Sequence, residues 1–235
     1  MVKNLEEIKV IGFDADDTLW VNETYFRDAE HAICKLLSHY ETPNKIDQEI
    51  FKMEMKNLGI YGYGVKAFIL SMVEVALELS NYTVSNQVIT EILDIGKAML
   101  NKPVELLSGV ETTLKTLSKK YRLIVITKGD LLDQERKLER SGLSKYFHHI
   151  EIVSDKKPNN YSTVLKHLEI EPKSFLMVGN SLKSDILPLI NIGAQAVHIP
   201  FHTTWAHETV SPAETKDKEF TTLKSISELP ALLAL

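Results

Sequence analysis

The segment EIKVIGFDADDT, residues 7–18, joins a short apolar run to three closely spaced acids. Residues 7–13 have the length and composition of a buried strand, and Asp14 follows them directly. Asp14 and Asp16 lie two positions apart where this strand ends, so a turn of the backbone can bring both carboxylates into one cleft. The segment therefore predicts a core strand with acidic side chains at its carboxyl end.

Outward from this segment the apolar pattern changes twice. Residues 23–100 have helical spacing and predict four helices, whereas the chain beyond 101 alternates helices with four further strands, at 122–127, 149–153, 174–178 and 194–199. Apolar strands that alternate with helices are typical of a parallel sheet covered on both faces. We therefore expect an α/β fold with a doubly wound parallel sheet, formed by residues 1–20 and 101–235, and a helical insertion at 21–100.

Polar residues follow each of the first four predicted strands. In sheets of this kind ligands bind outside the carboxyl ends of the strands. The segments at these ends are Asp14-Ala15-Asp16-Asp17-Thr18, Thr127-Lys128-Gly129-Asp130, Asp155-Lys156-Lys157-Pro158, and Gly179-Asn180-Ser181 with Asp185 one helical turn further on. Acids, a hydroxyl, a lysine and an amide are therefore expected to converge on one crevice.

The order and positions of these four segments resemble the four motifs of the haloacid dehalogenase superfamily. The resemblance covers nearly the whole chain, including a helical cap domain inserted after the first motif. It implies a phosphatase in which Asp14 attacks phosphorus and forms an aspartyl-phosphate. It also implies that Asp16 protonates the leaving oxygen and later activates the hydrolytic water.

The other motif residues receive roles from the same resemblance. Thr127 and Lys157 are expected to hold the phosphoryl oxygens, because the family places its functional lysine directly before proline. Lys156 is then expected to be a solvated neighbour. Lys128 stands where the family tends to have a small or amide residue, and the sequence leaves open whether it adds charge near the phosphate or is a surface lysine.

The expected cofactor is Mg²⁺, whose charge would offset the repulsion between a phosphate ester and a carboxylate. The resemblance implies Asp14, the backbone carbonyl of Asp16 and the fourth motif as ligands. That motif departs from the pattern, because Asn180 replaces an acid that many relatives have after the glycine. Asp185 matches the second acid of the motif, and the sequence does not decide which of the two binds the metal directly. For Asp17 a hydrogen-bonded turn role is favoured.

Specificity is expected to come from the helical insertion. The segment 57–66 is interpreted as a loop between its second and third helices, where the glycines give freedom and Tyr61, Tyr63 and Lys66 can contact an organic leaving group. A small phosphorylated metabolite is the expected substrate, without a more specific identity.

Three other functions remain possible from sequence. A 2-haloacid dehalogenase of the same superfamily attacks carbon without a metal, but such enzymes lack an acid at the position of Asp16. A phosphosugar mutase would retain Asp16 and is not excluded. A non-catalytic binding module is disfavoured because both the nucleophile and the motif lysine are present.

Composition limits the partners and the compartment. The chain has 235 residues, a formal net charge of −5 and one cysteine, Cys34. No basic stripe suggests nucleic-acid binding, and no apolar run approaches the roughly 20 residues of a membrane-spanning helix. Residues 1–7 lack the apolar segment of a signal peptide, so we expect a cytoplasmic protein. The oligomeric state is not predicted.

Overall fold

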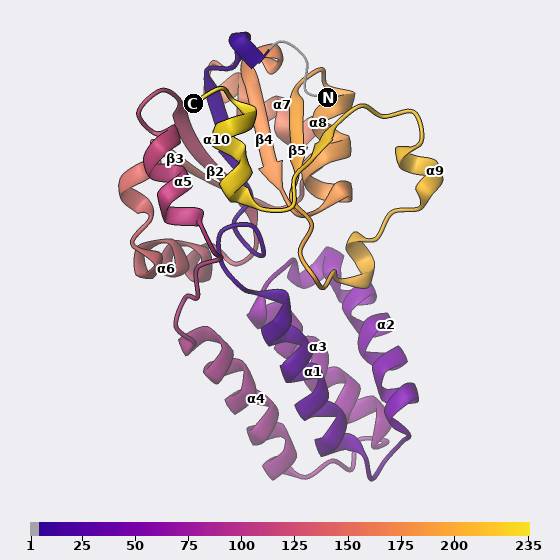
Figure 1. Cartoon of the computed structure of the whole chain (residues 1–235). Coiled ribbons are helices and arrows are strands. Elements are labelled where there is room, and N and C mark those ends of the chain that lie inside the picture. Colours follow the sequence, from indigo (N-terminus) through magenta and orange to yellow (C-terminus); the bar gives the residue numbers. More distant parts are fainter. Residues whose placement is uncertain (1–4) are drawn as a thin grey trace. The chain divides into compact units, whose positions relative to one another are not determined.

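The computed structural model describes residues 5–235 (Figure 1). Residues 1–4, which belong to the predicted core segment 1–20 and to the stretch considered for a signal peptide, lie outside the described residues. The chain divides into two compact units. The core unit contains the chain up to Glu23 together with 104–128 and 135–235, and the helical unit contains 24–103 and 129–134.

The core unit is built on a six-stranded sheet in the order β3-β2-β1-β4-β5-β6, and every neighbouring pair is parallel. The strands are β1 (Val10–Phe13), β2 (Arg122–Lys128), β3 (His149–Val153), β4 (Phe175–Gly179), β5 (Gln195–His198) and β6 (Thr221–Thr222). The predicted doubly wound parallel sheet is confirmed. Strand β6 was not predicted, because two residues are too few to form a readable pattern.

Helices cover both faces of this sheet (Figure 1). Alternate side chains of a strand point to opposite faces, so β1, β2, β4 and β5 each contribute to two apolar clusters. One cluster receives residues from α5 (Val110–Leu117), α6 (Leu131–Ser141) and α10 (Leu229–Leu232). The other receives residues from α7 (Pro158–His167) and α8 (Leu187–Asn191). Burial on both faces explains why β1, β2 and β4 carry continuous apolar runs rather than alternating ones.

The register of the sheet fixes where the first motif begins. Phe13 on the central strand pairs with Val125 of β2 and with Val178 of β4. The next residue, Asp14, continues this ladder, because its backbone N–H donates to the carbonyl of Val178 at 2.9 Å. The nucleophile expected from sequence is thus attached to the middle of the sheet.

The helical unit contains α1 (Glu23–Leu37), α2 (Pro43–Tyr61), α3 (Val65–Leu79) and α4 (Asn86–Asn101). It has an apolar cluster of its own, which includes Ile33, Ile50 and Met72. Among residues 5–235, no helix is both long enough and apolar enough to cross a membrane.

The loop predicted at 57–66 is wrong in extent. Helix α2 continues to Tyr61, and only Gly62, Tyr63 and Gly64 connect it to α3. Asn57 lies within α2, and its buried amide donates to Ser71 and Glu74 on α3, both at 3.1 Å. Gly62 and Gly64 have φ of 75° and 104°, values that glycine adopts without strain. These two glycines let the chain pass from α2 to α3 in three residues.

Short elements complete the chain. They are the single turns Leu5–Glu7, Ser144–Tyr146, Pro172–Ser174, η5 (Ala206–Glu208) and Ile226–Glu228, the π-type turn η4 (Leu182–Ile186), and the short helix α9 (Pro212–Thr215).

Candidate active site

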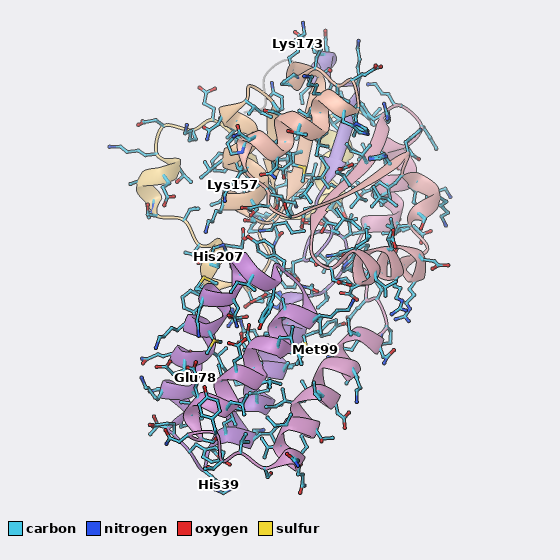
Figure 2. All side chains as sticks on the ribbon, turned by 180° about the vertical axis from the view of Figure 1, so that it is seen from behind. His39, Glu78, Met99, Lys157, Lys173 and His207 are labelled. Carbon is cyan, nitrogen blue, oxygen red and sulfur yellow. The ribbon has the colours of Figure 1, made fainter. Side chains whose placement is uncertain are left out.

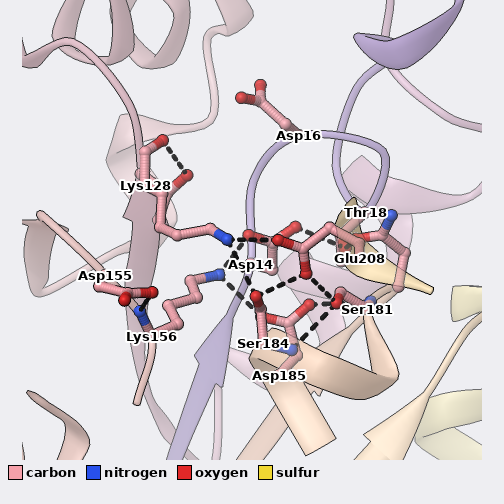
Figure 3. Close-up of polar contacts among 12 residues, drawn as sticks. Asp14, Asp16, Thr18, Lys128, Asp155, Lys156, Ser181, Ser184, Asp185 and Glu208 are labelled. Carbon is pink, nitrogen blue, oxygen red and sulfur yellow. Dashed lines mark hydrogen bonds and ion pairs between the residues drawn. The ribbon is translucent and has the colours of Figure 1, made fainter. Parts of the chain in front are cut away.

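Asp14 is the centre of a buried ion-pair cluster in the core unit (Figure 3). Its side chain is 10% exposed, with Oδ1 accepting from Lys156 Nζ and Oδ2 from the hydroxyl of Thr18 at 3.0 Å. Burial raises the pKa of Asp14 to about 7, although the Lys156 ammonium acts to lower it.

Lys156 connects two carboxylates. Its side chain is 1% exposed, and its ammonium contacts Asp14 Oδ1 and Asp185 Oδ1, the latter at 2.7 Å. Burial acts to lower the pKa of Lys156, but the two carboxylates outweigh burial and raise it above its ordinary value. The ammonium therefore remains charged.

The structure does not place Lys157 at this cluster, contrary to the sequence prediction. The side chain of Lys157, which is labelled in Figure 2, is 74% exposed. It pairs with Asp155 at 2.7 Å. Lys157 has an extended backbone, with φ −99° and ψ 164°, just before Pro158 begins α7. Neighbouring side chains of an extended chain point in opposite directions, so only one lysine of the pair can enter the core. That lysine is Lys156.

Asp185 is held by the turn that follows β4. Its Oδ2 accepts the backbone N–H of Ser181 at 3.0 Å, while Oδ1 accepts from Lys156. Gly179 makes this possible, because a Cβ at that position would overlap the Asp185 carboxylate. The Gly-Asn-Ser sequence at the end of β4 thus has a steric reason for its glycine.

Asn180 and Thr127 lie at the ends of β4 and β2, the two strands that flank β1. The Thr18 hydroxyl lies 3.3 Å from Asn180 Oδ1 as well as 3.0 Å from Asp14 Oδ2, so a single hydroxyl links the first and fourth motifs. Thr127 is buried at the end of β2, and its hydroxyl donates to the carbonyl of Lys128 at 3.2 Å. A role of Thr127 in holding phosphate remains a prediction.

Asp16 points away from the cluster (Figure 3). Its Oδ1 accepts from the indole N–H of Trp20 at 2.7 Å and from Lys137 Nζ at 2.6 Å. The turn role expected for Asp17 is confirmed, because its carboxylate accepts the backbone N–H groups of Asn22 and Glu23. The three acids of the first motif therefore have three different environments.

Lys128 is a largely buried member of a second network. Its ammonium donates to Ser184 Oγ at 2.9 Å and to Glu208 Oε1 at 2.6 Å. Glu208 lies in η5, far beyond the four motifs in the chain. Glu208 was not predicted from sequence, and nothing in the pattern around residue 208 distinguishes it from a surface acid.

Two further residues were missed. Lys156 is adjacent to Lys157, the lysine that the motif predicted, so the sequence did indicate this position. A motif match cannot tell which of two adjacent lysines faces inward. For Lys137, which contacts Asp16, no motif exists. Its position is set only by the packing of α6 in the core unit.

Tyr61, Tyr63 and Lys66 belong to the helical unit. The Tyr61 hydroxyl donates to Glu74 at 2.8 Å, and Lys66 pairs with Asp130 at 2.9 Å, both within that unit. Tyr63 lies in the turn between α2 and α3. Their expected contact with a leaving group remains a prediction.

The donor atoms of the core unit suit magnesium. Among residues 5–235 no three His, Cys, Asp or Glu side chains form a metal-binding group. Mg²⁺ does not need one, because it binds through one or two carboxylates and completes its shell with water and substrate phosphate. Asp14 and Asn180 offer a carboxylate and an amide oxygen on either side of the Thr18 hydroxyl, a set of hard oxygen donors. Asp185 is 1% exposed and one of its oxygens accepts a backbone N–H, that of Ser181, and whether Asp185 or Asn180 binds the metal directly remains a prediction.

Relatives of this chain include several phosphatases. The human N-acylneuraminate-9-phosphatase is 24% identical over 97% of this chain and 95% of its own length. The glyceraldehyde 3-phosphate phosphatase of Methanothermobacter thermautotrophicus is 27% identical over 96% of this chain and its whole length.

Solved structures and the family match agree. A haloacid dehalogenase-like family hydrolase from Xanthomonas campestris is 37% identical and superposes with a TM-score of 0.86, covering 97% of this chain and 91% of that one. A 2-haloacid dehalogenase from Pseudomonas syringae, at 20% identity and a TM-score of 0.62, shares the fold over 97% of this chain and 98% of its own. The haloacid dehalogenase-like hydrolase family matches residues 8–193. The chain therefore belongs to the haloacid dehalogenase-like hydrolases.

Proposed function

We propose that this protein is a magnesium-dependent phosphatase that hydrolyses a small phosphorylated metabolite through an aspartyl-phosphate on Asp14. The observation that carries the proposal is the buried contact of Asp14 with Lys156, at the carboxyl end of the central strand. This arrangement supplies a nucleophile together with a fixed positive charge beside it. Both are what an anionic ester requires for attack by a carboxylate.

In the first step a carboxylate oxygen of Asp14 bonds to phosphorus and the ester P–O bond breaks. The leaving oxygen takes a proton from Asp16. In the second step Asp16 removes a proton from water, the water oxygen bonds to phosphorus, and the bond to Asp14 breaks. Ester and water become alcohol and inorganic phosphate, and both acids return to their starting state.

Asp16 must change its contacts to perform this role. Its carboxylate is bound by Trp20 and Lys137 and directed away from Asp14. A rotation about its side-chain bonds that breaks these two contacts would bring the acid toward the leaving oxygen. Trp20 and Lys137 are then partners of the resting state of the acid.

Lys156 takes over the role that was predicted for Lys157. Its ammonium stabilises charge on the phosphoryl oxygens in the loose transition state, together with Thr127. The contact of Lys156 with Asp185 keeps the ammonium in place while Asp14 reacts, since Asp185 is 1% exposed and held by Ser181.

Bound Mg²⁺ would supply positive charge that offsets the repulsion between phosphate and carboxylate. Asp14, the main-chain carbonyl of Asp16 and Asn180 are the proposed direct ligands, and Asp185 a neighbour that binds through water. An amide at position 180 contributes no charge, so we expect Asn180→Asp to increase the apparent affinity for magnesium more than it changes the chemical step.

A small metabolite is the proposed substrate class. The two relatives described above have names that specify phosphorylated metabolites, N-acylneuraminate 9-phosphate and glyceraldehyde 3-phosphate. A dehalogenase is disfavoured because Asp16 is retained, and a mutase has no observation in its favour among the described residues of the core unit. The helical unit is proposed to choose among leaving groups.

The test is release of inorganic phosphate from an aryl phosphate and from a panel of phosphorylated metabolites. We expect turnover with magnesium, none with a chelator, and recovery on adding the metal back. Acid-quenched enzyme should carry one phosphoryl group, located by mass spectrometry on Asp14. Full activity without metal would contradict the proposal.

Asp14→Asn and Asp14→Ala separate the nucleophile from its surroundings. Both should lose turnover by at least roughly a thousandfold, since covalent catalysis is removed. The alanine variant excludes activity that arises from deamidation of asparagine. Appreciable turnover of Asp14→Ala would overturn the assignment of the nucleophile.

A further inference from the structure

Glu208 makes contacts that a surface acid in a connecting loop does not need. Its Oε1 accepts from Lys128, and its Oε2 accepts from the hydroxyls of Ser181 and Ser184 at 2.5 and 2.6 Å. The side chains of Glu208 and Lys128 are each only 13% exposed. A carboxylate this buried is maintained by its partners, since an unpaired one would be costly.

The hydrogen bonds of this network have consistent directions. The Ser184 hydroxyl accepts from Lys128 and donates to Glu208, while Ser181 Oγ accepts the backbone N–H of Ser184 and also donates to Glu208. Ser184 precedes Asp185, whose carboxylate holds Lys156. Glu208 is therefore connected to both lysines that extend toward Asp14 in Figure 3.

Lys128 creates the need for such a partner. It follows Thr127 at the end of β2, and its ammonium is directed toward Asp14 beside that of Lys156 (Figure 3). Lys156 is balanced by two carboxylates, but Lys128 brings a second positive charge to the same place. An ammonium without a carboxylate of its own attracts anions, and inorganic phosphate is the product of the proposed reaction.

We infer that Glu208 is a positioning residue of the phosphoryl site, which holds the Lys128 ammonium beside Asp14 and neutralises it so that phosphate is released after hydrolysis. This inference rests on the proposed phosphatase function. Ser181 and Ser184 orient the Glu208 carboxylate, and η5 with its preceding loop is thereby part of the active site. The family motifs end before this segment.

The experiment measures the dissociation constant of inorganic phosphate, in the presence of magnesium, by calorimetric titration of the full chain. Glu208→Gln keeps the size of the side chain and removes its charge. We expect it to bind phosphate about tenfold more tightly, which is the effect of one additional charge-assisted hydrogen bond, and to be inhibited by phosphate at correspondingly lower concentration. A residue with a merely structural role would weaken phosphate binding or leave it unchanged.

Two controls isolate the charge of Lys128. The double variant Lys128→Met with Glu208→Gln should lose the tenfold increase in affinity, because the unbalanced ammonium is gone. Glu214→Gln makes the same change of net charge at an exposed residue that contacts Ser211, and it should bind phosphate like the wild type. If Glu208→Gln fails to fold, Glu208→Asp replaces it. The shorter side chain keeps the carboxylate but moves it away from Lys128, and it should also increase the affinity for phosphate.

The outcomes are distinct. Suppose that the wild type turns over phosphate esters but Glu208→Gln binds phosphate no more tightly than the wild type. That result would overturn this inference and leave the proposed function intact. The same criterion applies to Glu208→Asp where that variant replaces Glu208→Gln. An increase in affinity that persists in the double variant would also overturn it. A wild-type protein that neither turns over phosphate esters nor binds phosphate would overturn the proposed function and this inference with it.

Discussion

The core unit and the helical unit bury polar groups in different ways. In the core unit, Asp14 meets Lys156 and Lys128 meets Glu208, partners separated by 142 and 80 positions in the chain. In the helical unit, buried Glu30 pairs with Arg27 three residues earlier, and Asn57 donates to Ser71 on the next helix. Long-range buried charge is thus a feature of one unit and local polar pairing a feature of the other.

This difference indicates which buried polar groups serve catalysis and which serve packing. A buried ion pair costs desolvation energy that its attraction barely repays, so such pairs indicate function more than stability. The exposed pairs of the helical unit, such as Lys45 with Glu49, contribute little either way. Substitutions that remove charge should therefore affect activity in the core unit and have small effects in the helical unit.

The sharpest test of this contrast uses two adjacent lysines. Lys156→Met should lower kcat/KM by roughly a hundredfold or more, because a charge that faces the phosphoryl oxygens is removed. It should also destabilise the protein by about 3–5 kcal/mol, since two carboxylates stay buried without their cation. Denaturant unfolding and steady-state kinetics measure both effects.

Lys157→Met is the matched control. Its side chain is 74% exposed and its ion pair with Asp155 lies at the surface, so activity and stability should change little. Equal loss in the two variants would show that the assignment of Lys156 is wrong.

Much of this site follows from sequence because the sheet is strongly patterned. Apolar runs and their polar ends place Asp14, Thr127 and Asn180 at strand ends, and the structure has them there. The choice between Lys156 and Lys157 depends on which way a side chain faces after β3. A one-residue shift reverses that direction, and spacing from a proline does not determine it.

Glu208 and Lys137 were beyond reach for a different reason. Each contacts the site from a segment whose own pattern is that of an ordinary surface loop or helix. Their positions depend on tertiary packing of chain segments that no local propensity describes. The turn between α2 and α3 was likewise predicted to be too long, because Asn57 lies within α2. Its side chain bonds to Ser71 and Glu74 on α3, and the local sequence pattern does not reveal these contacts.

A glycine in each unit extends the comparison to packing. Gly179→Ala should destabilise the core unit by about 1–3 kcal/mol, because the added methyl overlaps the Asp185 carboxylate and must displace it from Lys156. Gly59→Ala, at an exposed position of α2 with open space around it, should stabilise by about 0.5–1 kcal/mol through helix propensity. Thermal unfolding measures both, and destabilisation of the same size in each would contradict the contrast.

The acid side of the stability profile tests the Glu208 network. Burial acts to raise the pKa of Glu208, but Lys128 and the two serines outweigh it and lower the pKa to about 2 from an ordinary 4.5. Because the pKa of Glu208 is lower in the folded than in the unfolded protein, its ionised carboxylate stabilises the folded state by about 3 kcal/mol above pH 4.5. This stabilisation is lost as the pH falls toward 2 and the carboxylate is protonated. The stability difference between wild type and Glu208→Gln should therefore be largest above about pH 5 and shrink by about pH 3. A difference independent of pH would contradict the shift.

The smallest expected effects lie in the turn of the helical unit. If this unit chooses among leaving groups, Tyr63→Ala should change the ratio of kcat/KM between two dissimilar phosphate esters by a few-fold, about 1 kcal/mol. Tyr61→Phe and Lys66→Met, which remove the contacts with Glu74 and Asp130, should change that ratio by a similarly small factor. Lys156→Met should depress both esters in similar proportion, since each presents the same phosphoryl group in the transition state. Measuring the ratio rather than either rate removes general losses of activity. If all three variants of the helical unit leave the ratio unchanged, Tyr61, Tyr63 and Lys66 do not select the leaving group.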